Sequence, residues 1–231
     1  MIIDIASRLA DLNERMARVC REHERDPSSV ELLAVSKTRD AEAVQRAIAA
    51  GQVSFGENRV QELLLKSAAF CESPPRWHMI GSLQTNKVRD LVGVPHLDLL
   101  HSLDRHKLAT TLENCLDEAG RSLEVLLQIR ATDEESKHGC PPQEAEELAR
   151  HIIDECPHLC LRGLMAMGPR EGDPMLVFGR VAGLRRDLQQ SLGMEFPVLS
   201  LGMTGDLEAA IAAGSTMVRV GTAIFGPRAP R

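Results

Sequence analysis

Short apolar runs alternate with longer amphipathic segments along nearly the whole chain. Runs of this length, bounded by turn residues, are typical of buried strands, and eight occur, over residues 32–35, 53–55, 77–80, 97–101, 123–129, 161–167, 198–199 and 216–220. Between them, apolar positions recur at helical spacing over residues 40–50, 57–70, 85–91, 104–119, 142–155, 174–192 and 207–214. A further helix is predicted before the first strand, with Ile5, Leu9, Leu12, Met16 and Val19 on one face.

This order of elements predicts an α/β fold. Strands that are each separated from the next by a helix run parallel with right-handed crossovers, and eight such units close into a single (β/α)8 TIM-type barrel. We expect one domain over residues 1–231, with an extra N-terminal helix at about 4–25 and the barrel at about 31–228. The alternative is an open doubly wound sheet, but no Gly-x-Gly-x-x-Gly motif follows the first strand.

Composition excludes several classes of function. The net charge of −6 comes from 27 basic and 33 acidic residues without a basic stripe, and the aromatic residues are five Phe and one Trp, so nucleic-acid binding is not expected. The apolar runs are too short to span a membrane, and the chain start lacks the pattern of a secretory leader, so we expect a cytoplasmic protein. The six cysteines are then reduced thiols, and their spacing predicts no metal site.

A loop rich in hydroxyl groups and glycine follows the seventh strand. Residues 200–206 lead from that strand into a helix, so backbone N–H groups, the helix dipole and the hydroxyls of Ser200 and Thr204 converge on one point. A second small turn, Gly221-Thr222, follows the eighth strand, and phosphate sites of parallel barrels are often built after the last two strands. The pattern predicts a phosphate site; the alternative is a loop that only caps its helix.

Lys37 directly follows the first strand, so its amine is expected at the mouth of the barrel. Burial and a nearby Arg219 would favour the neutral amine, which is a nucleophile that forms a Schiff base with an aldehyde. The alternative is a lysine whose stem lies on apolar surface with its head in water. An amine that faces a phosphate site fits either pyridoxal 5′-phosphate (PLP) or a sugar-phosphate aldolase substrate.

Arg219 favours PLP, because an arginine on the last strand can serve as the partner of the pyridine nitrogen. A guanidinium does not release its proton, so the ring nitrogen would stay unprotonated and the ring would be a weaker electron sink. Two other features fit more than one role. His78 and His101 are either general bases or hydrogen-bonded core residues, and residues 133–139 are predicted to form a solvated loop that could cover the site.

Six motifs then carry a family resemblance. They occur in order as Leu33–Thr38, Phe55–Glu62, Trp77–Lys87, Leu161–Met167, Leu199–Thr204 with Asp206, and Arg219–Gly226. Together they resemble the pyridoxal phosphate homeostasis protein family. The resemblance implies a barrel similar to the N-terminal domain of alanine racemase, with PLP held as a Schiff base on the lysine of the first strand. The site residues that it implies are Lys37 for the Schiff base, Asn58 and Met79 beside the ring, Ser200, Gly202, Thr204, Gly221 and Thr222 for the phosphate, and Arg219 for the ring nitrogen. Arg59 is a departure, because the family often has Tyr there.

Three functions are compatible with these residues. The first is a PLP-binding protein that buffers the cofactor or delivers it to PLP-dependent apoenzymes without robust turnover, as a monomer or weak homodimer. The second is an amino-acid racemase of the related fold, which needs a second acid/base group; in the racemases another domain supplies a Tyr, and this chain has no Tyr. The third is a Schiff-base aldolase, which wants acid/base partners around a mid-barrel lysine, whereas Lys37 follows the first strand. The residues favour the first.

Overall fold

The computed structural model describes residues 4–70, 74–132 and 138–227. The strands are β1 (Glu31–Val35), β2 (Ser54–Glu57), β3 (Arg76–Met79), β4 (Leu97–Leu103), β5 (Leu123–Ile129), β6 (Leu159–Ala166), β7 (Val198–Ser200) and β8 (Met217–Val220). The α-helices are α1 (Ile5–Glu22), α2 (Ala41–Ala49), α3 (Val60–Ala69), α4 (Val88–Val92), α5 (His106–Ala119), α6 (Ala145–Glu155), α7 (Pro174–Leu192), α8 (Leu207–Ala212) and α9 (Thr222–Phe225). The short 3-10 turns are η1 (Pro27–Ser29), η2 (Thr85–Lys87) and η3 (Pro142–Glu144).

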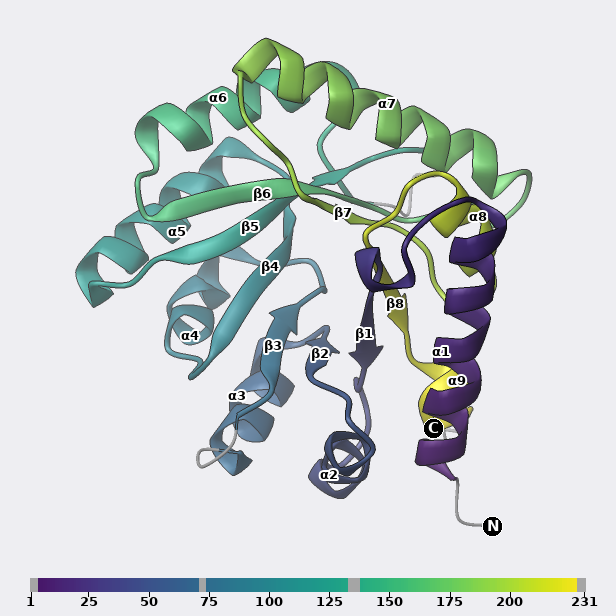
Figure 1. Ribbon diagram of the computed structural model, residues 1–231. Helices are drawn as coiled ribbons and strands as arrows, with labels where there is room; N and C mark the ends of the chain where they lie inside the picture. Colours follow the sequence, from purple (N-terminus) through teal and green to yellow (C-terminus); the bar gives the residue numbers. More distant parts are fainter. Residues whose placement is uncertain (1–3, 71–73, 133–137, 228–231) are drawn as a thin grey trace.

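The strands form a closed barrel in sequence order, with β8 pairing in parallel with β1 (Figure 1). This confirms the predicted (β/α)8 architecture and excludes the open sheet. Most predicted boundaries shift by one to three residues, and at residue 57 the type of element differs: the segment is strand rather than helix, and α3 begins only at Val60. Glu57 still belongs to the ladder because its carbonyl accepts the N–H of Ile80 at 2.8 Å.

The N-terminal helix completes the outer ring of helices. The element after β8, α9, is only four residues long and cannot cover the sheet alone. α1 lies against α2, α8 and α9 and fills this position, with its apolar face buried (Figure 1). Two arginines fasten it there: Arg15 Nε lies 2.6 Å from Glu208 Oε1 on α8, and Arg25, just beyond the helix, donates to the Ile211 carbonyl.

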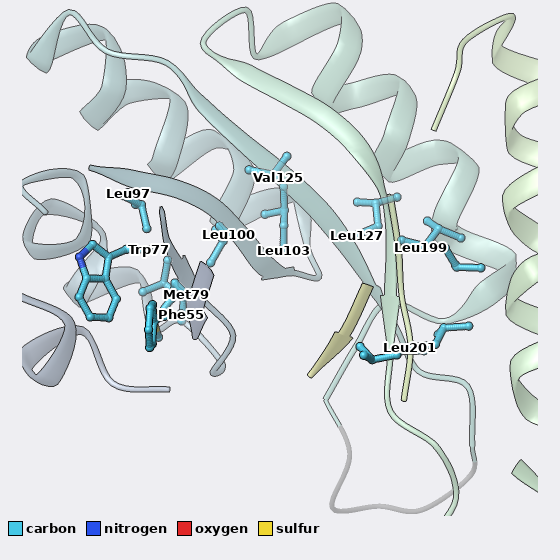
Figure 2. Close-up of a cluster of buried hydrophobic side chains, with 14 of the residues drawn as sticks. Phe55, Trp77, Met79, Leu97, Leu100, Leu103, Val125, Leu127, Leu199 and Leu201 are labelled. Atoms are coloured by element: carbon cyan, nitrogen blue, oxygen red, sulfur yellow. The ribbon is translucent and has the colours of Figure 1, made fainter. Parts of the chain in front are cut away.

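The larger part of the core lies between the sheet and the helices. Figure 2 shows the outward-facing side chains of neighbouring strands in one cluster, including Phe55, Trp77 and Met79. Trp77 is fully buried, and its ring centroid lies 5.8 Å from that of Phe55 and 6.1 Å from that of Phe70. A smaller apolar cluster forms a layer that includes Leu33, Leu99, Leu126, Met165 and Met217.

Other sequence predictions can be compared with the described residues. Within these ranges no helix is both long and apolar enough to cross a membrane, and no group of three or more His, Cys, Asp or Glu side chains could hold a metal ion. The described cysteines (Cys20, Cys115, Cys140, Cys156 and Cys160) are free thiols. Cys71 and residues 133–137 of the predicted loop lie outside the described residues.

We predict that Trp77→Ala lowers the free energy of unfolding by about 3–5 kcal/mol, because the truncation leaves a cavity between Phe55 and Phe70. Far-UV circular dichroism during urea unfolding would measure the change, since Trp77 is the sole tryptophan and its removal abolishes the fluorescence signal. The control is Leu65→Ala on α3, where the side chain is 76% exposed and a change within about 0.5 kcal/mol is expected. Equal effects of the two substitutions would contradict the packing assigned here.

Candidate functional site

The barrel interior changes from apolar to polar toward the carboxyl ends of the strands. Because inward-facing side chains recur every second residue, the position two residues beyond the apolar layer faces inward again. On β4, β5, β7 and β8 that position holds His101, Gln128, Ser200 and Arg219. All four are buried, so polar groups form the floor beneath the carboxyl-terminal mouth of the barrel.

A cavity of about 430 Å³ opens above this floor. It is lined by Val35, Lys37, Arg39, Asn58, Ile80, Gly81, Ser82, Gln128, Met165, Met167, Met203, Thr204, Gly205, Arg219, Gly221 and Thr222. These residues come from the ends of β1, β2, β3, β5, β6, β7 and β8, which is where barrels of this type place their sites. One cavity therefore brings together Lys37 and Arg219 with the two threonines, Thr204 and Thr222, although Lys37 is far from the others in the sequence.

Helix α3 holds the turn that carries Lys37 on both sides of that residue. Before it, Lys66 Nζ donates to the Ser36 carbonyl at 2.8 Å and to Glu57 Oε1 at 2.6 Å. After it, the Thr38 N–H donates to Glu62 Oε2 at 2.9 Å. Thr38 has a φ of +65°, which is strained for a β-branched residue and persists only where the surroundings enforce it. The backbone around Lys37 is thus held from α3 on both sides, in addition to the turn's own hydrogen bond from the Arg39 N–H to the Ser36 carbonyl at 3.0 Å.

The Glu57–Lys66 pair lies beneath this turn and is almost fully buried. Glu57 is 0% exposed, and its Oε1 also accepts the Ser36 hydroxyl at 2.6 Å. Burial raises the pKa of the Glu57 carboxyl above its usual range, while the adjacent Lys66 ammonium opposes the rise. Burying such an ion pair costs desolvation free energy. Removing either partner would destabilise the fold, because the other charge would remain buried without compensation.

Arg219 on β8 is the cation at the floor of the cavity. It is 5% exposed, and its Nη1 donates to the Ser200 carbonyl at 2.6 Å and to Ser200 Oγ at 2.7 Å. Its Nη2 donates to the Ala166 carbonyl at 2.9 Å. Burial lowers the pKa of Arg219 to about 10, so the side chain stays charged at neutral pH. The guanidinium is therefore a fixed hydrogen-bond donor that faces the cavity.

The turn after β8 and the loop after β7 offer donors for an anion at the cavity. The first intrahelical bonds of α9 are donated by Ile224 and Phe225 to the Gly221 carbonyl at 3.0 and 2.9 Å, which leaves the N–H groups of the preceding residues at the helix start. In the β7–α8 loop, Asp206 Oδ1 accepts the Met203 N–H at 2.6 Å and holds the loop in shape. A Cβ added at Gly205 would meet nothing within 4 Å, so the loop is open beside the cavity.

The cavity contains six of the nine residues that sequence analysis predicts for the site: Lys37, Asn58, Thr204, Arg219, Gly221 and Thr222. Ser200 and Gly202 lie behind the lining. The Ser200 hydroxyl is used by Arg219, and the Gly202 carbonyl accepts the Arg219 N–H at 3.0 Å. Met79 does not line the cavity; it points outward into the core between sheet and helices (Figure 2), because its neighbour His78 faces inward. Ile80, the next residue, lines the cavity instead.

Sequence reasoning missed other members of the site. Arg39 lines the cavity, and its Nη2 donates to the carbonyls of Gly226 and Pro227 at 2.6 and 2.8 Å, which ties the end of the described chain to the mouth. Gln128 and Glu124 are the two polar residues of β5, and Gln128 is the one nearer its carboxyl end. Glu62 and Lys66 carried only the spacing of an exposed helical pair, and their roles depend on what α3 packs against.

The donor set fits a phosphorylated aldehyde with a ring acceptor. An amine, a cationic donor on the floor and donors for an anion are the groups that such a molecule requires. A Cβ at Gly221 would lie 3.0 Å from the Val35 carbonyl, so the turn at these donors packs directly on β1, which leads into Lys37. The residues present are therefore compatible with PLP.

Comparisons with known proteins agree with this fit. The family model for the alanine racemase N-terminal domain matches residues 8–229. The chain is 42% identical to the pyridoxal phosphate homeostasis protein of Pasteurella multocida and 44% identical to that of Escherichia coli K12, in each case with 97% of both chains covered. It is also similar to the solved structure of PipY of Synechococcus elongatus with PLP bound, at 36% identity and a TM-score of 0.83, covering 96% of this chain and 100% of that one.

We predict that Lys66→Met lowers the free energy of unfolding by about 3–5 kcal/mol at about pH 8, because it leaves the Glu57 carboxylate buried without its cation. Removing the cation raises the folded-state pKa of Glu57 further above the unfolded value. The loss is therefore largest above that folded-state pKa and shrinks as the pH falls to about 5. Urea unfolding at the two pH values would measure it.

The matched control is the double variant Lys66→Met/Glu57→Gln, which has no buried charge at this position. We expect it to recover most of the stability at the higher pH and to lose the pH dependence. A loss in Lys66→Met that is the same at both pH values would show that the buried carboxyl is not its cause.

Proposed function

This chain belongs to the pyridoxal phosphate homeostasis protein family, and we propose that it holds PLP covalently on Lys37 and buffers or delivers the cofactor without robust turnover. The observation that carries the proposal is the cavity that combines Lys37, Arg219 and the turn at Gly221 and Thr222. PipY, which is 36% identical to this chain over nearly its whole length, has been solved with PLP bound. We propose the cytoplasm as the place of action, PLP-dependent apoenzymes as recipients, and a monomer or weak homodimer as the working form.

Each of the three groups would contact a different part of the cofactor. Bound PLP supplies an aldehyde for amines and a ring that withdraws electrons. Lys37 Nζ, as the neutral amine, would hold the cofactor through its aldehyde carbon, a condensation that releases one water made of the aldehyde oxygen and the two amine protons. The hydroxyls of Thr204 and Thr222 and the first N–H groups of α9 would hold the phosphate, while Arg219 would donate to the ring nitrogen and Asn58 would lie beside the ring. Water would reverse the attachment, so the site could release what it holds.

Arg219 also argues against vigorous catalysis. Its pKa of about 10 keeps it protonated at neutral pH, so it donates to the ring nitrogen without giving up its proton. The ring then withdraws electrons weakly, which disfavours the carbanion chemistry of a racemase. A two-base racemase also requires an acid/base group opposite the lysine, and the chain has no Tyr to supply it. These features favour a binding and transfer role over an amino-acid racemase.

We predict that borohydride reduction of the purified yellow protein fixes the mass of the reduced cofactor on Lys37, because reduction makes the C=N bond permanent. Peptide mass spectrometry would locate it. Lys37→Ala should retain only loosely held PLP that dialysis removes. The control is Lys87→Ala, which removes a lysine that pairs with Asp90 of α4. This variant should leave the label on Lys37.

Two results would contradict the proposal. Label on another lysine in the unmodified sequence would rule out Lys37 as the attachment point. Rapid exchange of the α-proton of either alanine enantiomer in deuterated water, at enzyme-like turnover, would favour the racemase.

We further predict that Thr222→Val weakens PLP binding about tenfold, because a hydrogen bond to the charged phosphate is lost. Binding of pyridoxal, which has no phosphate, should be unchanged within about twofold. Titration of each ligand by absorbance would separate the two cases. Equal weakening for both ligands would show that Thr222 does not contact the phosphate.

A further inference from the structure

Two buried histidines that do not line the cavity connect its floor to the other end of the barrel. His78 Nδ1 lies 3.0 Å from His101 Nε2, and both rings are at most 1% exposed. Beyond them, His101 Nδ1 lies 3.2 Å from Ser200 Oγ, the oxygen that accepts from Arg219 Nη1 at 2.7 Å. On the other side, His78 Nε2 lies 3.4 Å from Oδ2 of Asp98, the second residue of β4. Side chains from β3, β4, β7 and β8 thus form one continuous polar chain.

The carboxylate end of this chain determines its direction. An arginine can only donate hydrogen bonds, and an ionised carboxylate can only accept them. With a carboxylate in front of it, His78 must carry its proton on Nε2, so its Nδ1 accepts from His101. His101 then carries its proton on Nε2, and its Nδ1 accepts the hydroxyl proton of Ser200. The Ser200 oxygen is left to accept from Arg219, as the 2.7 Å contact requires. With two neutral imidazoles this arrangement satisfies the contacts from His78 Nδ1 to Arg219, while His78 Nε2, which makes no hydrogen bond among the described residues, lies 3.4 Å from the Asp98 carboxylate as an electrostatic contact.

The electrostatics of the interior agree with this arrangement. The charged or titratable groups that face His101 are His78 from β3 and Arg219 from β8, and His78 in turn faces Asp98 from β4. Complete burial, with the positive charge of Arg219, holds the pKa of His101 well below its usual range. The His78 ring, whose Nε2 lies 3.4 Å away, lowers the pKa of Asp98, which keeps the carboxylate ionised. Both conditions for a directional chain are therefore met at neutral pH.

We propose that His101 is a positioning residue for the cofactor ring, acting through Ser200 and Arg219, and that the chain ending at Asp98 fixes its tautomer. The inference rests on the proposed function, because it assigns Arg219 to the ring nitrogen of PLP. By accepting the Ser200 proton, His101 turns the Ser200 lone pair toward Nη1. Arg219 has five N–H donors, and three of them have partners on Ser200 and Ala166 among the described residues. The relay thereby holds the remaining donors toward the cavity.

The direction can be tested in the unmodified protein. Two-dimensional ¹⁵N–¹H spectra of the imidazole rings distinguish the two neutral tautomers and the imidazolium. We expect both His78 and His101 to be neutral with the proton on Nε2 at about pH 7. An Nδ1–H tautomer or an imidazolium at either residue would overturn the relay. This measurement requires neither a variant nor bound cofactor.

The effect on the cofactor can be tested with three variants and PLP labelled with ¹⁵N in the ring. His101→Leu removes the acceptor for the Ser200 hydroxyl, and His101→Asn keeps an oxygen near the position of Nδ1. Leu99→Val removes one methylene from the apolar layer below, opposite His78 in the β3–β4 register, and keeps every polar side chain of the relay. We expect His101→Leu to move the ring ¹⁵N shift away from its hydrogen-bonded value and to weaken PLP binding about tenfold. His101→Asn should restore the shift and bind within about threefold of the unmodified protein, and Leu99→Val should leave the shift unchanged.

The outcomes separate this inference from the proposed function. A ring shift that is identical in His101→Leu and the unmodified protein, or one that Leu99→Val moves equally, would refute the positioning role while borohydride labelling of Lys37 stays intact. Failure of that labelling would instead refute the covalent attachment, and the ring shift of non-covalently bound PLP would still report on Arg219. If His101→Leu does not fold, the His101→Asn shift and the tautomer measurement decide the question.

Discussion

A guanidinium buried inside a barrel of parallel strands is the constraint on which the rest of this site depends. Arg219 stays protonated at neutral pH and is only 5% exposed, so most of its N–H groups must find acceptors inside the fold. The end of β6 supplies the Ala166 carbonyl, and β7 supplies both a carbonyl and a hydroxyl from Ser200. These contacts fix the registry of the last three strands around the floor of the cavity. They also require that the Ser200 oxygen accept a hydrogen bond from Arg219. This requirement limits the hydrogen bonds that Ser200 can make with His101, deeper in the barrel.

The other side of the cavity is built by a different device. Lys37 lies on a turn whose flanking residues are held from α3, by Lys66 at Ser36 and by Glu62 at Thr38. The strained backbone at Thr38 and the desolvated Glu57–Lys66 pair are both unfavourable when taken alone. They coexist because each supports the position of the same turn. Both features lower the local stability, and both hold the turn that positions the Lys37 amine. Such local costs are common at functional sites.

These two devices explain why a racemase-type barrel is suited to carry a cofactor. A firmly placed amine and a firmly placed donor define where an aldehyde and a ring nitrogen can lie, with an anion cup at the third point. In the proposed binding mode this donor would leave the ring a weak electron sink, and the chain has no Tyr to serve as the acid/base partner found in two-base racemases. The described residues supply the groups for this binding mode within one cavity. A site of this kind fits the proposed role of holding a reactive aldehyde.

The sequence by itself determined the order of strands and helices, the barrel and the position of Lys37 at its mouth, because period-2 and period-3.6 patterns and strand ends are local properties. It also indicated Arg219, Thr204, Gly221 and Thr222, since parallel closure brings the ends of β1, β7 and β8 together. Only the tertiary structure decided which face of a strand a residue takes, which placed Met79 in the outer core and Ser200 behind the lining. It also decided that His78 and His101 join Ser200 in one chain and that α3 holds the lysine turn. Such contacts depend on the registry and packing of elements far apart in sequence, and no local pattern encodes them.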